Sequence, residues 1–128
     1  MSNRQTINTD QAPQAIGTYS QAVKSGTTVY ISGQIPLVAD TMELLEGDFK
    51  DKTRLCFDNL EAIAVAAGGS LGDAAKVTIF LMDMSNFAQV NEVMAEYFQQ
   101  PYPARAAVGV KDLPKGVPVE IEAILELK

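Results

Sequence analysis

The chain has 128 residues, a mass of 13.8 kDa and a mean hydropathy of +0.03, as is typical of one soluble globular domain, and we expect residues 1–128 to form a single unit. Its 16 acidic and 10 basic residues give a net charge of −6, which disfavours non-specific binding to nucleic acid because phosphate backbones are repelled. The absence of histidine excludes Ser-His-Asp and Cys-His mechanisms within the chain and removes the commonest metal ligand.

A polar segment precedes the first expected strands. Residues 1–18 are polar and interrupted by proline and glycine, so we expect an arm or loop leading into the fold. β-branched and aromatic residues increase over 19–23 and again over 27–33, and Ser25-Gly26 between them indicates a hairpin. A glycine and a proline then end the regular pattern, and we expect a loop that continues through Gly47.

Residues 48–67 carry the clearest helical pattern. Asp48 is the expected N-cap, and Gly68-Gly69 supply the C-terminal stop. The apolar stripe, at alternating spacings of four and three residues, consists of Phe49, Thr53, Cys56, Leu60, Ile63 and Ala67. A strand is expected at about 75–82, and because both of its faces are apolar we expect it to be central.

A second helix is expected over residues 87–99. Asn86 followed by Gln89 predicts a capping box at its start. Its expected buried side consists of Phe87, Val90, Met94, Tyr97 and Phe98. Two prolines end the helix, and strands are expected over 104–110 and 117–127.

The resulting order, β-β-α-β-α-β-β, predicts an α+β fold. Two amphipathic helices cover only one face of a sheet, so the opposite face would stay partly apolar and exposed in a monomer. We therefore expect a homo-oligomer.

Arg105 is the first candidate for chemistry. It lies among small residues after the two prolines, and on a period of two it shares its face with Ala107 and Gly109, which leaves room for a small ligand. A guanidinium in such a place suits bidentate binding of a carboxylate. An ion pair with a carboxylate on a neighbouring strand explains the same pattern, and the residues alone leave both interpretations open.

Glu120 and Glu122 are the second candidates. They lie on one face of the last expected strand, so their Cα atoms are about 6.5–7 Å apart. A partly buried carboxylate there could act as a general base or acid, whereas the ordinary alternative is a solvated strand face.

Tyr19 and Ser32-Gly33 flank irregular backbone and could donate hydrogen bonds to a ligand. Asn91 interrupts the second helix beside its apolar stripe and suits either a buried hydrogen bond or a site contact.

The single cysteine, Cys56, belongs to the core stripe and cannot form an intrachain disulfide, which indicates a reducing, cytoplasmic compartment. No apolar run approaches the roughly 20 residues of a membrane span, and the first residues have no apolar segment of the kind a secretory signal needs. We expect no membrane association.

Several linked segments resemble the RidA/YjgF family over essentially the whole chain. They are AIGTYSQAV (15–23), VYISGQIP (29–36), NLEAIAVAAG (59–68), KVTIFLMDMSNFAQVNEVMAEYF (76–98), PYPAR (101–105) and PARAAVGVKDLPKGVPVEIEAI (103–124). The resemblance implies a chorismate-mutase-like α+β fold with two helices on one face of a mixed sheet. It also implies a homotrimer with ligand clefts between adjacent subunits.

The activity implied by the resemblance is that of a 2-iminobutanoate/2-iminopropanoate deaminase, which hydrolyses reactive 2-imino or 2-enamino acids to 2-oxo acids and ammonia. No metal or organic cofactor is implied. The resemblance assigns the carboxylate-binding arginine to Arg105 and the water-activating glutamate to Glu120. It assigns further substrate contacts to Tyr19, Ser32, Gly33 and Asn91.

Two positions depart from the pattern of many deaminase members. Ala107 stands where they have a cleft cysteine, and Thr18 stands where they have a proline, so the side-chain preference of the pocket is expected to differ. The alternative function is a non-catalytic regulatory trimer that binds small 2-oxo or amino acids through Arg105. An RNA-cleaving function, also attributed to the family, is disfavoured by the acidic charge and the lack of histidine.

Overall fold

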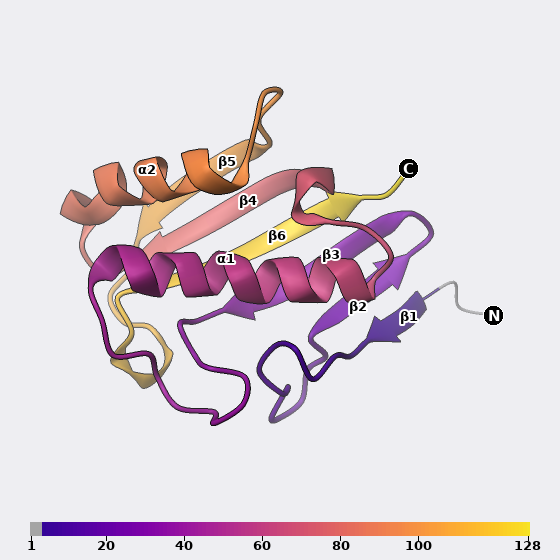
Figure 1. Ribbon diagram of the computed structural model, residues 1–128, viewed down its shortest axis with the longest axis horizontal. Coiled ribbons are helices and arrows are strands. Elements are labelled where there is room, and N and C mark those ends of the chain that lie inside the picture. Colours follow the sequence, from indigo (N-terminus) through magenta and orange to yellow (C-terminus); the bar gives the residue numbers. More distant parts are fainter. Residues whose placement is uncertain (1–3) are drawn as a thin grey trace.

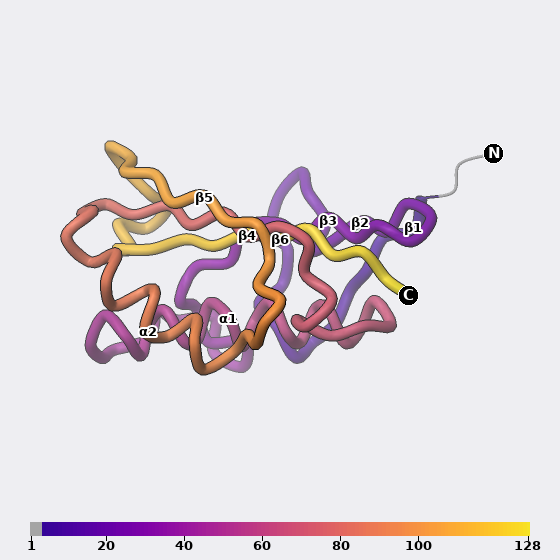
Figure 2. The backbone as a smooth tube through the Cα atoms, turned by 90° about the horizontal axis from the view of Figure 1, so that it is seen from above, coloured from indigo at the N-terminus to yellow at the C-terminus, as the bar shows by residue number. Residues whose placement is uncertain are grey.

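The computed structural model describes residues 4–128, which form one six-stranded sheet with the strand order β1-β2-β3-β6-β4-β5. The elements are β1 (Arg4–Ile7), β2 (Ala22–Ser25), β3 (Thr28–Gln34), α1 (Phe49–Ala66), β4 (Ala74–Leu81), α2 (Phe87–Tyr97), β5 (Ala104–Gly109) and β6 (Val119–Glu126), with one-turn 3₁₀ helices at Leu71–Asp73, Met84–Asn86 and Pro114–Gly116. Both α-helices lie on the same side of the sheet (Figures 1 and 2).

The predicted α+β architecture is confirmed. β4 and β5 run parallel, whereas the other neighbouring strands are antiparallel, so the sheet is mixed. The last strand, β6, lies between β3 and β4 and joins the N-terminal hairpin to the rest of the sheet (Figure 1). The strand expected at 75–82 is indeed internal, paired with β6 on one side and β5 on the other.

The N-terminal segment differs from the prediction of an arm without regular structure. β1 pairs antiparallel with β2, from Arg4 opposite Ser25 to Ile7 opposite Ala22. Three of its four side chains are exposed and the fourth is half-buried. An edge strand of this kind is held by backbone hydrogen bonds and shows no apolar alternation, which explains why the sequence did not reveal it. The first part of the expected arm, residues 1–3, lies outside the described residues.

The start of α1 agrees with its prediction, whereas that of α2 does not. The Asp48 side chain accepts a hydrogen bond from the Asp51 N–H at 2.8 Å and caps α1. Asn86 makes no side-chain cap, so the predicted capping box is wrong. Its side-chain oxygen Oδ1 instead accepts a hydrogen bond from Gln89 Nε2 at 3.2 Å. A 3₁₀ turn at Met84–Asn86 leads into α2 in place of a capping box, and the Asp83 side chain caps this turn by accepting a hydrogen bond from the Ser85 N–H.

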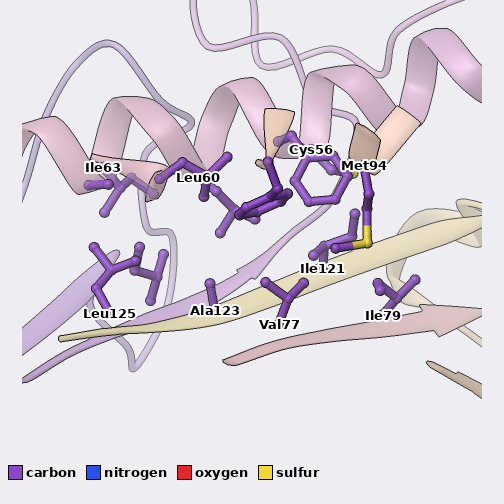
Figure 3. Close-up of a cluster of buried hydrophobic side chains, with 14 of the residues drawn as sticks. Cys56, Leu60, Ile63, Val77, Ile79, Met94, Ile121, Ala123 and Leu125 are labelled. Carbon is purple, nitrogen blue, oxygen red and sulfur yellow. The ribbon is translucent and has the colours of Figure 1, made fainter. Parts of the chain in front are cut away.

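The core lies between the helices and one face of the sheet (Figure 3). Alternate residues of the central strands point toward α1 and are fully buried, among them Val77, Ile79, Ile121 and Leu125. The opposite face is partly apolar and open, as predicted. Tyr30 is 52% exposed there and Val108 is 42% exposed, on strands whose flanking residues point toward the helices.

Candidate functional site

Glu120 lies in a pocket of about 750 Å³ on the open face of the sheet. The wall of this Glu120 pocket comes from residues 13–21, residues 32–37, Met42, Pro114-Lys115 and the start of β6. Tyr19, Ser32 and Gly33, which were predicted as substrate contacts, all line it together with Glu120 and Glu122. Within one chain the fold therefore brings four of the predicted site residues together.

An irregularity in β3 gives Glu120 its place. The register between β3 and β6 shifts between Ile31 and Gln34, so Ser32 and Gly33 leave the regular ladder beside β6. The Glu120 side chain lies against Gly33, where an added Cβ would be only 2.9 Å from Glu120 Cδ. A glycine at this position lets the carboxylate pack directly on the backbone, and any larger residue would displace the carboxylate.

The electrostatics of Glu120 suit a proton acceptor. Burial raises the pKa of its carboxyl group, and the neighbouring negative charge of Glu122 raises it further. A raised pKa makes the carboxylate a stronger base while leaving it ionisable. The pair that the sequence left as either a solvated face or a catalytic group is thus asymmetric, with Glu120 half-buried and Glu122 exposed.

Tyr19 and Ser32 already have partners within the chain. The Tyr19 hydroxyl oxygen accepts a hydrogen bond from the Ile16 N–H at 3.3 Å, and the ring is 53% exposed. The Ser32 hydroxyl donates to the Ser20 carbonyl at 2.6 Å, and its backbone N–H donates to the Gln21 carbonyl at 2.9 Å. The Ser32 hydroxyl is therefore available to a ligand as an acceptor, not as the donor expected from the sequence.

Arg105 and Asn91 line a different pocket, of about 430 Å³, between α2 and β5. Arg105 Nη1 donates to Asn91 Oδ1 at 2.8 Å and contacts Met94 Sδ at 3.7 Å. The guanidinium also lies over the Phe87 ring, 4.8 Å from its centroid, in a cation–π arrangement. Asn91 thus holds the arginine with its carbonyl oxygen, and α2 determines the direction of the guanidinium.

Side-chain hydrogen bonds link α2 to α1. Arg54 Nε and Nη2 donate to the Glu96 carboxylate at 2.9 and 3.0 Å, and this contact lowers the pKa of Glu96. The Tyr97 hydroxyl donates to Asp58 at 2.7 Å. These links fix the helix that carries the partners of Arg105.

The two pockets lie on opposite faces of the sheet. In the parallel β4–β5 pair Arg105 is opposite Val77, which points toward the helices, so Arg105 shares that side. Glu120 is opposite Phe80 on β4 and points to the open face. One chain therefore does not bring Arg105 and Asn91 to Glu120, and the resemblance assigned all of them to a cleft between adjacent subunits.

Sequence reasoning missed two residues that support these pockets, one in contact with Arg105 and one in the lining of the Glu120 pocket. Phe87 was assigned only to the buried side of its helix, since its apolar spacing carries no sign of an arginine above its ring. Gln21 was not singled out, yet its side chain is only 2% exposed and lies at the Glu120 pocket. A polar residue next to a short strand gives no sequence signal of burial.

Residues 4–128 contain no group of three or more Cys, Asp or Glu side chains placed to hold a metal ion. Within the same range, no helix combines the length and apolar composition that are needed to cross a bilayer.

Comparison with known proteins identifies the family. The family model described as Endoribonuclease L-PSP, the RidA/YjgF family, matches residues 9–127. The chain belongs to this family. The resemblance seen in the sequence segments is therefore confirmed.

Relatives in the RidA/YjgF family align over nearly the full chain. A protein of Dermatophagoides farinae named 2-iminobutanoate/2-iminopropanoate deaminase is 45% identical over 100% of both chains. The crystal structure of RidA from an Antarctic Psychrobacter is 58% identical, with a TM-score of 0.93 over 96% of this chain and 99% of that one. The structure of Escherichia coli TdcF with bound serine is 45% identical, with a TM-score of 0.90 over 97% and 99% of the two chains.

Proposed function

We propose that this protein hydrolyses 2-imino and 2-enamino acids, such as 2-iminobutanoate and 2-iminopropanoate, to 2-oxo acids and ammonia. The observation that carries the proposal is the half-buried Glu120 carboxylate with its raised pKa, packed on Gly33 in an open pocket. The name of the Dermatophagoides relative, which aligns over the full chain, supports the same reaction.

In this reaction Glu120 is the general base. It takes a proton from a water molecule as the water oxygen forms a bond to the electrophilic imine carbon. Glu120 passes this proton to the imine nitrogen, which gives a tetrahedral carbinolamine. Glu120 then takes the proton of the carbinolamine hydroxyl and passes it to the amino group as the C–N bond breaks, so ammonia leaves and the 2-oxo group forms. Glu120 ends the cycle in its starting state, and neither an oxidant nor a cofactor is consumed.

Arg105 holds the substrate carboxylate. Asn91 and Met94 both contact its Nη1, so among residues 4–128 the Nε and Nη2 donors are left for a ligand. These two N–H groups lie on one edge of the guanidinium and match the two oxygens of a carboxylate. The Phe87 ring below the guanidinium limits its movement.

The complete site requires two copies of the chain, since Arg105 and Glu120 face opposite sides of one sheet. We propose a homotrimer in which the Arg105 pocket of one subunit meets the Glu120 pocket of the next. The exposed apolar side chains of the open face, Tyr30 and Val108, support this assembly because a partner would bury them. Three clefts between adjacent subunits would result.

A coupled imine assay tests the proposal. An L-amino-acid oxidase generates imines from a panel of amino acids, semicarbazide traps them, and loss of the semicarbazone signal reports hydrolysis. We expect the wild-type protein to suppress the signal.

Arg105→Ala should abolish activity mainly through lost binding, and Glu120→Gln should lose about a hundredfold or more in kcat while it retains ligand affinity. Equal turnover by Glu120→Gln would remove Glu120 from the mechanism. Glu46→Gln, at an exposed position that lines neither pocket, is the matched control.

A second candidate is a regulatory trimer that binds small amino or 2-oxo acids without turnover. The TdcF structure with bound serine favours it, because that relative holds an unmodified amino acid. Calorimetric binding of 2-oxobutanoate that Arg105→Ala abolishes, with no hydrolysis of any imine by the wild-type protein, would support this candidate over the deaminase.

A further inference from the structure

Part of the Glu120 pocket is formed by a segment without secondary structure of its own. Residues 9–19 connect β1 to β2 and contain no strand or helix. From here on the word arm means this segment only, not the longer segment 1–18 expected from the sequence. Ile16 and Tyr19 of the arm line the pocket, and both are more than half exposed. A connecting segment of this kind keeps a defined shape only where its backbone groups find partners.

The side chain of Gln21 supplies those partners. Its Oε1 accepts a hydrogen bond from the Thr9 N–H at 2.8 Å, and its Nε2 donates to the Thr9 carbonyl at 2.9 Å and the Pro13 carbonyl at 2.8 Å. A longer contact of 3.4 Å reaches the Ala12 carbonyl. One amide thus binds the arm at both ends of the 9–13 stretch, as a strand partner would.

The main chain of Gln21 links the arm to the opposite wall. Its carbonyl accepts from the Ser32 N–H, and Ser32 is followed by Gly33, on which Glu120 packs. Both amide hydrogens of Gln21 are used within the chain, and the residue is only 2% exposed. The side chain of Gln21 therefore has no donor left for a ligand and would act through the residues that it holds.

We propose that Gln21 is a positioning residue of the Glu120 pocket, which holds the arm so that Ile16 and Tyr19 form the ligand-facing wall. The proposal rests on the function proposed above. Glu120 and Gly33 belong to β6 and β3, which pair with each other, so the general base keeps its place without Gln21. Loss of the Gln21 amide should therefore weaken ligand binding far more than the chemical step.

The test compares Gln21→Met with Gln11→Met. Methionine preserves the length of the side chain and removes its hydrogen bonds, while Gln11 is an exposed glutamine of the same arm whose amide only reaches the neighbouring Asp10. We expect Gln21→Met to raise both KM for the imine and Kd for 2-oxobutanoate by about tenfold, with kcat within about threefold of the wild-type value. Hydrogen exchange at the Thr9 amide should accelerate in the same variant. Gln11→Met should match the wild type in all four measurements.

A purely structural role would have a different signature. It would lower the folded fraction, and with it the apparent kcat, at unchanged KM, and this result would overturn the proposal. Unchanged exchange at Thr9, or faster exchange with wild-type KM and Kd, would also overturn it. If Gln21→Met does not fold, Gln21→Asn, which keeps the amide but shortens its reach, takes its place under the same criteria. A wild-type protein that neither hydrolyses imines nor binds 2-oxobutanoate would refute the proposed function itself. An active wild type with a Gln21→Met variant of the same KM and Kd would refute only the role of Gln21.

Discussion

The Glu120 carboxylate packs on the backbone of Gly33, so closely that a Cβ at this position would lie 2.9 Å from Glu120 Cδ and 3.1 Å from its Cγ. The contact joins β3 to β6 at the point where their register shifts. It places a carboxylate, whose pKa is raised by burial, above a stretch of backbone that carries no side chain. The position of the proposed general base thus depends on a missing Cβ.

Gly33→Ala should displace this carboxylate. Since the atoms in the way belong to the flexible end of a side chain, Glu120 can rotate aside, and we expect a loss of about tenfold or more in kcat with a change in Tm of only a few degrees. Gly72→Ala is the control, because a Cβ there meets only Ser70 Oγ at 3.4 Å, an ordinary contact. Wild-type kcat in Gly33→Ala would show that the position of Glu120 does not matter.

Glu122→Gln should shift the pH dependence of activity. Glu120 must be ionised to accept a proton, so kcat/KM falls as the pH drops through its pKa. The charge of Glu122 is one of the two causes that raise this pKa, and its removal should move the acidic limb to lower pH. Glu126→Gln, on the same face but hydrogen-bonded to Thr27 and Thr28, should leave the limb in place. An unmoved limb in Glu122→Gln would argue that another group controls the profile.

Glu120→Gln should stabilise the protein at neutral pH. The pKa of Glu120 is raised in the folded state, so the folded protein binds more protons than the unfolded chain between the two pKa values, and stability falls as the pH rises through that window. The destabilisation by the ionised carboxylate is complete above the folded pKa and absent below the unfolded one. Tm of Glu120→Gln should therefore exceed that of the wild type at pH 8, and the difference should disappear near pH 4. A gain that persists at pH 4 would contradict this explanation.

Asn91→Leu should loosen Arg105. The substitution keeps the size of the side chain but removes the Oδ1 acceptor that holds Nη1 at 2.8 Å, while the contact of the guanidinium with Phe87 remains. We expect KM to rise about tenfold or more, in line with the loss of about 1.5–3 kcal/mol for a hydrogen bond to a charged group, with little change in kcat. Steady-state kinetics over a range of imine concentrations separate the two parameters. A fall in kcat at constant KM would assign Asn91 to the chemical step.

The local pattern of residue types along the chain predicted most of the secondary structure. α1 and its Asp48 cap, the hairpin at Gly26 and the internal position of β4 all follow from spacing, turn residues and apolar content, which are properties of neighbouring residues. The same reasoning failed where a different interaction decided the outcome. β1 is an edge strand held by its backbone, and α2 begins from a 3₁₀ turn in place of a capping box.

For the candidate site, too, the sequence predicted the residues, whereas tertiary contacts decided how they are arranged. By itself the sequence determined the family, the α+β class and the candidates Arg105 and Glu120, because these depend on residue types in a fixed order along the chain. Only the tertiary structure decided that the two side chains occupy opposite faces, since this follows from the insertion of β6 beside β4 and the parallel pairing of β5. Likewise, only folding brings the buried amide of Gln21 to the arm and the carboxylate of Glu120 to Gly33. Contacts between residues distant along the chain are chosen by packing and register, which no local pattern encodes.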